Sequence, residues 1–220
     1  MVAQLQYDSS NIDDVLFSSI AEALFQQGYF VLPNALPSRV SDALMQHLAM
    51  FNEAEFSRAE IGRGQAQTHN TFVRRDKIAW IESTSPHSQV WLNWTQALQT
   101  FLNRRLFMGL FSFESHFAFY RPGDFYQKHV DAFRGQSNRM LSLVTYLNKD
   151  WQPDQGGELV IYNSESGSEL IKVTPNFGTL VLFLSEEFPH EVLRADRTRY
   201  SVAGWFRVNS STSERVDPPR

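Results

Sequence analysis

A histidine and an aspartate stand two residues apart in the stretch FYQKHVDAF, as His129 and Asp131. In an extended strand, residues i and i+2 point to the same face, so this spacing places an imidazole beside a carboxylate. Both groups are common metal ligands, although an HxD pair also arises by chance in many strands. A metal site therefore requires a third ligand from elsewhere in the chain.

The third ligand could come from any of the other histidines, which are His47, His69, His87, His116 and His190. The first of these falls in a helical pattern, the next two fall in loops, and the fourth has no defined facing on its strand. His190 instead begins the strand HEV late in the chain. In a jelly roll, an early and a late strand can lie close together at the barrel mouth, which makes His190 the best candidate.

Two imidazoles and one carboxylate on one face of a metal form the facial triad of non-haem Fe(II) oxygenases. The remaining positions suit O2 and a bidentate 2-oxo acid, whose far carboxylate would need a buried cation. Arg199 lies in the right part of the chain, after His190 and a turn, and its planar guanidinium can pair with both carboxylate oxygens. Arg197 and Arg194 are the competing candidates.

The elements that must position these residues change in type near residue 110. Helices are predicted at 11–28, 37–56 and 88–106, where apolar residues recur every three or four positions. Short strands are expected at 29–36 and 77–82. From residue 110, a series of short alternating segments separated by turns predicts many strands without intervening helices.

This order of elements predicts an α+β fold, a double-stranded β-helix (jelly roll) with the N-terminal helices packed on one sheet. We expect a single domain over 1–208 and a flexible tail at 209–220. Within the domain, residues 1–109 would form a helical support and residues 110–208 the jelly-roll core.

Composition and charge restrict the class of function. The 220 residues carry a net charge of −4, which argues against a surface dedicated to nucleic-acid phosphates. Cysteine is absent, which excludes disulfides and thiolate metal ligands. No apolar run has the length of a membrane span, and the N-terminus lacks the pattern of a signal peptide. We therefore expect a soluble cytoplasmic protein with no nucleic-acid or membrane partner.

Over about residues 70–208, five stretches carry a resemblance to a known family: RRDKIAWIE, FAFYRPGDFYQKHVD, VTYLNKDW, GGELVIY and FPHEVLRADRTRYSVAGWF. On these stretches the chain resembles the prolyl 4-hydroxylases that use 2-oxoglutarate and Fe(II). It is most similar to the branch that contains the animal enzymes acting on hypoxia-inducible factor and bacterial relatives acting on elongation factor Tu. YLNKDW and HEV…TRY, at these separations, are the most specific parts.

The resemblance implies roles for the residues that match the family pattern. His129, Asp131 and His190 match the iron ligands. Arg199 matches the arginine that binds the distal carboxylate of 2-oxoglutarate, and Tyr146 matches a tyrosine whose hydroxyl shares that carboxylate. These roles agree with the metal and carboxylate chemistry inferred from the residue types.

Further positions of the pocket follow from the resemblance alone. Tyr120 matches a tyrosine near the iron-bound end of the cosubstrate, and Leu159 and Trp205 match apolar walls of the pocket. Arg139 resembles an arginine at the substrate-facing rim, although DAFRGQSNR is one residue longer here. Asp76, assigned to the same rim, lies beside the stretch 57–75, which would be the loop that covers the substrate.

The resemblance implies hydroxylation of a prolyl residue in an exposed loop of a protein partner, with elongation factor Tu or another translation component as candidates. Fe(II), 2-oxoglutarate and O2 would be required, ascorbate would support turnover, and succinate and CO2 would be released. Two alternatives stay open: a hydroxylase of a small molecule or free amino acid, and a non-catalytic metal-bearing jelly-roll sensor or binding protein. No oligomeric state is predicted.

Overall fold

The computed structural model of the chain describes residues 9–58, 73–132 and 138–209. Within these ranges the helices are α1 (Ser9–Gln27), α2 (Ser38–Leu48), α3 (Pro86–Leu106) and the short 3-10 helices η1 (Glu53–Glu55) and η3 (Pro153–Gln155). The strands are β1 (Tyr29–Leu32), β2 (Ser57–Arg58), β3 (Lys77–Trp80), β4 (Leu110–Tyr120), β5 (Tyr126–His129), β6 (Arg139–Tyr146), β7 (Leu159–Tyr162), β8 (Glu169–Val173), β9 (Leu180–Leu184), β10 (His190–Val192) and β11 (Arg199–Val208). None of the helices in these ranges is both long and apolar enough to cross a membrane.

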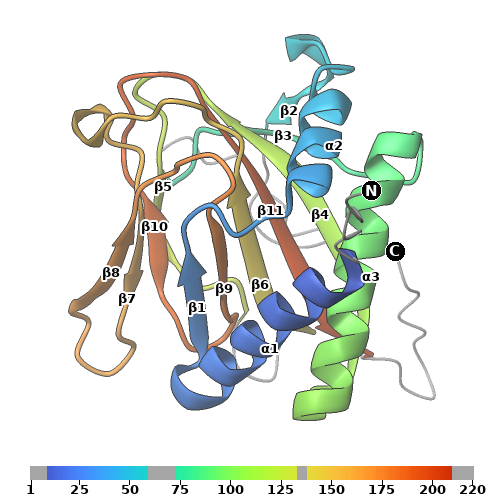
Figure 1. Cartoon of the computed structure of the whole chain (residues 1–220). Coiled ribbons are helices and arrows are strands. Elements are labelled where there is room, and N and C mark those ends of the chain that lie inside the picture. The colour runs from blue at the N-terminus through green and yellow to red at the C-terminus, as the bar shows by residue number, and fades with distance from the viewer. Residues whose placement is uncertain (1–8, 59–72, 133–137, 210–220) are drawn as a thin grey trace, which may run out of the picture.

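The strands form two antiparallel sheets that face each other. The larger sheet has seven strands in the order β1-β9-β6-β11-β4-β3-β2, and the smaller has four in the order β5-β10-β7-β8. Helices α1, α2 and α3 lie on the outer side of the larger sheet (Figure 1). The predicted α+β double-stranded β-helix, with N-terminal helices on one sheet, is thereby confirmed.

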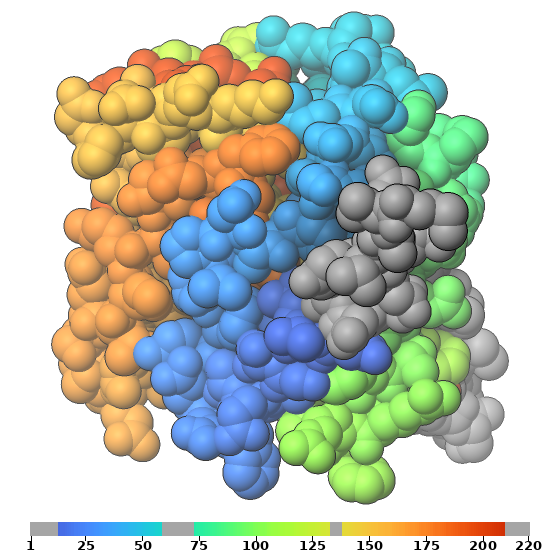
Figure 2. All heavy atoms as spheres, viewed as in Figure 1, coloured from blue at the N-terminus to red at the C-terminus, as the bar shows by residue number. Residues whose placement is uncertain are grey.

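The first half of the chain does more than support the jelly roll. β1 pairs with β9 and β3 pairs with β4, so strands that precede residue 110 extend both edges of the larger sheet. In the space-filling view, blue N-terminal residues lie directly against orange residues of the C-terminal half (Figure 2). The expected division at residue 110 is therefore not a boundary in the sheet.

Local capping explains where the helices begin and end. α3 is capped by Ser85, whose hydroxyl accepts from the Ser88 amide at 3.0 Å, and the helix begins at Pro86. The second helix, expected to reach residue 56, instead ends at Leu48. Asn52 then caps η1 by accepting from the Ala54 amide at 3.0 Å, so the predicted single helix is divided into α2 and a separate 3-10 helix.

The larger sheet separates two interiors because side chains alternate along each strand. On β11, Val202 and Phe206 belong to the core that the sheet shares with the helices. Arg199, Ser201 and Trp205 lie on the opposite face, toward the smaller sheet. The polar side chains of a candidate site are thus directed into the space between the sheets.

One buried histidine lies on this inner face without joining the candidate metal ligands. His116 packs edge-on against Trp80 at 5.3 Å between ring centroids and against Trp205 at 5.4 Å. Burial lowers the pKa of His116 to about 4, and the charge of Arg74 acts in the same direction. The imidazole is therefore neutral in the folded protein at neutral pH.

Protonation of His116 should make the metal-free protein less stable in acid. The pKa of His116 falls from 6.5 in the unfolded chain to about 4 in the fold. The contribution of the neutral imidazole to the free energy of unfolding is therefore fully present above pH 6.5 and is lost as the pH falls toward 4. In the variant His116→Met, the decrease in the free energy of unfolding between neutral and acid pH should be smaller by on the order of 3 kcal/mol. Urea denaturation of both proteins at pH 7 and near pH 4.5 measures this difference, and equal losses in the two proteins would contradict it.

Candidate active site

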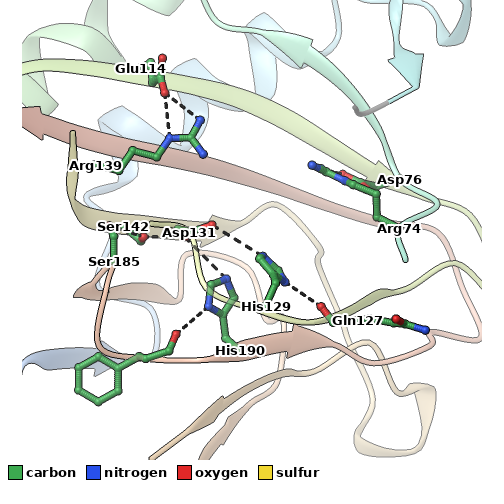
Figure 3. Close-up of polar contacts among 11 residues, drawn as sticks. Arg74, Asp76, Glu114, Gln127, His129, Asp131, Arg139, Ser142, Ser185 and His190 are labelled. Atoms are coloured by element: carbon green, nitrogen blue, oxygen red, sulfur yellow. Dashed lines mark hydrogen bonds and ion pairs between the residues drawn. The ribbon is translucent and has the colours of Figure 1, made fainter. Parts of the chain in front are cut away.

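Three side chains from two strand ends and the following bend converge on one point. His129 is the last residue of β5 and His190 the first of β10, and the two residues are direct partners in the antiparallel register. Asp131 lies two residues beyond β5. Its Oδ1 is 3.7 Å from His129 Nε2 and its Oδ2 is 3.7 Å from His190 Nε2 (Figure 3). One ligand atom from each residue lies within 4.8 Å of the other two.

Backbone carbonyls orient both imidazoles. His129 Nδ1 is 2.7 Å from the Gln127 carbonyl oxygen, and His190 Nδ1 is 3.0 Å from that of Phe188. A carbonyl can only accept, so each Nδ1 carries a proton, which leaves Nε2 as the ring nitrogen that can bind a metal. Such outer hydrogen bonds are the usual way in which proteins fix the tautomer of a metal-binding histidine.

The charge states also suit metal ligation. Burial lowers the pKa of His190 to about 4, and the neighbouring His129 acts in the same direction, so this imidazole is neutral at neutral pH. Burial alone would raise the pKa of Asp131, but in acid the protonated His190 lowers it, as do the hydrogen bond and charge of His129 and the charge of Arg139, so the pKa lies well below its usual range. The site thus offers a neutral nitrogen ligand and an ionised oxygen ligand without any proton having to leave.

Two imidazoles and one carboxylate match the donor set of a non-haem Fe(II) centre. Among the described residues, these three form the group of histidine and acidic side chains close enough to hold one ion. His47 lies instead in the core between the helices and the larger sheet, and His116 between two indoles. His87 lies in the first turn of α3, and His69 falls outside the described residues.

Arg199 is a buried cation in the same interior. Its side chain is 1 % exposed, its Nε donates to the Gly157 carbonyl at 2.9 Å, and Nη1 donates to Ser201 Oγ at 3.1 Å. Its guanidinium carbon lies 4.9 Å from the ring centroid of Tyr120 and 5.1 Å from that of Tyr146. No carboxylate in the described part of the chain pairs with it. A buried guanidinium in this state calls for an external anion.

Tyr146 supports the same conclusion. Its hydroxyl is buried and makes no hydrogen bond of standard geometry to any described residue, although it belongs to the surroundings of Arg199. Burial raises the pKa of Tyr146 to about 12 against the opposing effect of Arg199, so the phenol keeps its proton and can donate it. An unsatisfied donor beside a carboxylate-free guanidinium fits the distal carboxylate of a dicarboxylate such as 2-oxoglutarate.

The competing arginines point elsewhere. Arg197 donates to the Asp150 carbonyl at 3.2 Å and lies over the Trp151 ring, and the exposed Arg194 donates to the Gly123 carbonyl at 2.7 Å. Neither is in the interior that holds Arg199.

The apolar residues named from the resemblance divide into two groups. Leu159 is 2 % exposed and packs in one cluster with Tyr120 and Tyr146, so it lines the interior around Arg199. Burial raises the pKa of Tyr120 well above its usual range, which keeps this phenol neutral. Trp205 is also buried, but it lies further along β11, with the Arg139 guanidinium 3.6 Å from its ring centroid.

The two residues expected at the substrate rim are both engaged in ion pairs. Arg139 donates through Nε and Nη2 to Glu114 at 3.1 and 2.8 Å. Asp76 is 2 % exposed and accepts two hydrogen bonds from Arg74, at 2.8 and 2.6 Å. Asp76 is therefore a buried anchor, whereas the Arg139 side chain keeps an exposed fraction of 21 %. Figure 3 shows both pairs beside the three candidate ligands.

Several residues near the site carry no recognisable signal in the sequence. The Tyr126 ring stacks on His129 at 3.6 Å, and the Arg74 guanidinium lies 4.3 Å from the Tyr126 centroid. Ser142 donates to Asp131 Oδ2 at 2.6 Å. A tyrosine or serine on a strand is too ordinary to single out, because only the fold reveals its neighbour.

Part of the expected covering loop can be placed. Residues 59–72 lie outside the described part of the chain. The segment that follows pairs with β5: the Gln127 amide donates to the Val73 carbonyl at 2.8 Å and the Arg75 amide to the Phe125 carbonyl at 3.1 Å. The chain that leaves this stretch is therefore hydrogen-bonded to the strand that carries His129.

Comparison with known proteins places the chain in a family. Residues 115–207 match the 2OG-Fe(II) oxygenase superfamily. Human Egl nine homolog 1 is 29% identical over 142 residues, which cover 61% of this chain and 33% of that protein. Human prolyl hydroxylase EGLN3 is 24% identical over 204 residues, which cover 89% of this chain and 85% of that protein. The chain thus spans about a third of the first relative and most of the second.

Solved structures extend the match over the whole fold. A prolyl hydroxylase from Trichoplax adhaerens, solved with a peptide fragment of the hypoxia-inducible factor oxygen degradation domain, is 27% identical with a TM-score of 0.79, covering 92% of this chain and 94% of that one. A Pseudomonas putida prolyl-4-hydroxylase is 37% identical with a TM-score of 0.78, covering 89% of this chain and 100% of that one. The chain therefore belongs to the 2-oxoglutarate- and Fe(II)-dependent oxygenases of the hypoxia-inducible-factor prolyl hydroxylase-like family.

Proposed function

We propose that the chain hydroxylates a prolyl residue of a protein substrate, using Fe(II), 2-oxoglutarate and O2 and releasing succinate and CO2. The observation that carries this proposal is the arrangement of the candidate triad with a fully buried, carboxylate-free Arg199 in the same interior. A metal-bearing sensor or binding protein would not require a buried cation for a dicarboxylate. Family membership and the prolyl hydroxylases among its relatives support the choice of reaction.

Each residue has a separate task in this proposal. His129, Asp131 and His190 would hold Fe(II), which when bound supplies the redox chemistry that couples O2 and 2-oxoglutarate to C–H hydroxylation. Arg199 binds the distal carboxylate of 2-oxoglutarate as a charged fork, and the Tyr146 hydroxyl donates to the same group. Leu159 and Tyr120 keep water from this end of the pocket, which strengthens both interactions.

A protein substrate is favoured over a small molecule by the kinship with a Trichoplax enzyme that was solved with a peptide bound. An exposed prolyl loop of elongation factor Tu, or of another translation component, is the proposed partner. We place Arg139 and Asp76 at the substrate side of the site, Arg139 as a contact and Asp76 as a buried support. Ascorbate as an auxiliary reductant and a cytoplasmic location complete the proposal.

The decisive experiment uses the purified chain loaded with Fe(II). It is incubated aerobically with 2-oxoglutarate and a lysate fraction rich in translation factors, and tryptic peptides are searched for the mass of one added oxygen atom on proline. Succinate release that depends on the protein fraction, with oxygen on one prolyl site, supports the proposal. Oxygen found only on small molecules or free amino acids would replace it with the small-molecule alternative, and no succinate at all would favour a sensor.

Substitution of the carboxylate ligand should remove the metal. Asp131→Ala should weaken metal binding by more than about 100-fold, because loss of outer partners alone typically costs about 10–100-fold. Succinate production should disappear with it. Asp124→Ala, a carboxylate at a turn outside the site, is the matched control and should behave as the parent protein. Normal iron-dependent succinate production by Asp131→Ala would remove Asp131 from the ligand set.

Substitution of the buried arginine should affect the cosubstrate and spare the metal. Arg199→Ala should weaken 2-oxoglutarate binding by roughly 30- to 1000-fold, since loss of a charge-assisted fork costs about 2–4 kcal/mol. Metal affinity should stay within a few-fold of the parent. Calorimetric titration with a redox-inert divalent metal, followed by titration of the metal-loaded protein with 2-oxoglutarate, measures the two affinities, with Arg197→Ala as the matched control. If Arg197→Ala shows the larger loss, the carboxylate role passes to that residue.

A further inference from the structure

The carboxylate of the candidate triad has less backbone support than the two histidines. His129 and His190 are direct partners in the β5–β10 ladder, whereas the ladder ends at His129 and Asp131 follows in a bend. An aspartate at such a position can rotate between several side-chain conformations unless another group holds it. Side-chain hydrogen bonds must therefore set the orientation of this ligand.

Two buried serines from the opposite sheet supply that hold. Ser142 on β6 donates to Asp131 Oδ2 at 2.6 Å, and its oxygen lies 2.8 Å from Ser185 Oγ. Ser142 is 1 % exposed and Ser185 is fully buried. The Ser185 amide donates to the Met140 carbonyl at 3.0 Å, which ties the end of β9 to β6. Figure 3 shows the two serines in line with the carboxylate.

The direction of these hydrogen bonds follows from the charge of Asp131. An ionised carboxylate only accepts, so the Ser142 proton must point toward Oδ2. The Ser142 oxygen is then free to accept, and Ser185 is the donor of the pair. Each hydroxyl in this short chain polarises the next, which strengthens the final bond to the carboxylate.

We propose that Ser142, oriented by Ser185, is a positioning residue that sets the Asp131 carboxylate in its ligating orientation before the metal binds. This inference rests on the metal site of the proposed function and deepens it. Preorganisation removes the entropic cost of ordering the ligand at the moment of binding, so it appears as metal affinity. One oxygen of Asp131 is engaged by Ser142, which favours ligation through a single oxygen and leaves the other metal positions to the cosubstrates.

The test measures Co(II) binding to the metal-free protein, which does not depend on hydroxylase activity. Ser142→Ala should weaken Co(II) binding about 10- to 100-fold, the usual effect of losing an outer partner of a ligand, and should change the Co(II) absorption spectrum. Ser142→Thr keeps the hydroxyl and should restore most of the affinity and the parent spectrum. Ser185→Ala should give a smaller loss in the same direction.

A matched control separates positioning from the general cost of removing a buried hydroxyl. Ser41 is 3 % exposed in α2, donates to the Ser38 carbonyl at 3.1 Å and is remote from the ligands, so Ser41→Ala should bind Co(II) as the parent does. Parent-like affinity and spectrum in Ser142→Ala would overturn the inference. If Ser142→Ala does not fold, as judged by its melting curve, parent-like Co(II) binding by Ser185→Ala overturns it instead.

The Co(II) titration also keeps the two proposals distinguishable. Loss of affinity in Ser142→Ala together with no hydroxylated protein in the lysate experiment would sustain the positioning role and reject the prolyl hydroxylase function. Hydroxylated protein together with unchanged Co(II) binding in Ser142→Ala would sustain the prolyl hydroxylase function and reject the positioning role.

Discussion

The site depends on the antiparallel register that sets His190 directly opposite His129. A shift of this register by a single residue would turn one imidazole to the other face of the smaller sheet, because side chains alternate along a strand. The register is held by a further pairing of β10 with β7, so His190 sits on a central strand and not on an edge. The backbone carbonyls of Gln127 and Phe188 then aim the rings. The placement of the two candidate histidine ligands is thus largely set by strand pairing.

A second constraint on the fold is that it must bury the charged side chain of Arg199. Burying a guanidinium is unfavourable unless its hydrogen-bonding capacity is used. The fold provides the Gly157 carbonyl and Ser201 Oγ and leaves the rest of the guanidinium for an anion. Gly157 has φ of 73°, and a β-carbon there would come within 2.8 Å of the Ala195 side chain and 3.3 Å of Arg199 Cδ. The position favours glycine both because of its positive φ and because a side chain would be too close to its neighbours.

Much of this arrangement could be predicted from the sequence. The jelly roll follows from the run of short alternating segments after residue 110, and the convergence of residues 129, 131 and 190 follows from a histidine early and a histidine late in that run. The α2 helix ends eight residues before its predicted end, and Asn52 caps the separate 3-10 helix that follows; the asparagine is visible in the sequence, but its capping role depends on local geometry. Strand propensity alone could not reveal that β1 and β3 complete the larger sheet.

Other features lay beyond prediction because they are pairings between distant segments. Asp76 was expected beside a substrate loop, yet it is buried by its bidentate contact with Arg74. Asp131 was expected on a strand, yet it follows the strand and is held by a serine from the opposite sheet. No local pattern encodes either contact. The sequence identifies which groups bring the chemistry, and packing decides what supports them.

The stack formed by Arg74, Tyr126 and His129 is a further support of the candidate metal ligands. The Arg74 guanidinium lies over the Tyr126 ring, which in turn stacks on the His129 imidazole. Asp76 holds Arg74 at one end of the stack, and His129 is the candidate metal ligand at the other. Backbone hydrogen bonds also join the segment that bears Arg74 to β5 and the residue before it, so this segment and the strand are held together by both backbone and side-chain contacts. The orientation of the His129 ring is consequently tied to residues 73–76 as well as to its own strand, so the support of this candidate ligand reaches into a segment more than fifty residues earlier in the chain.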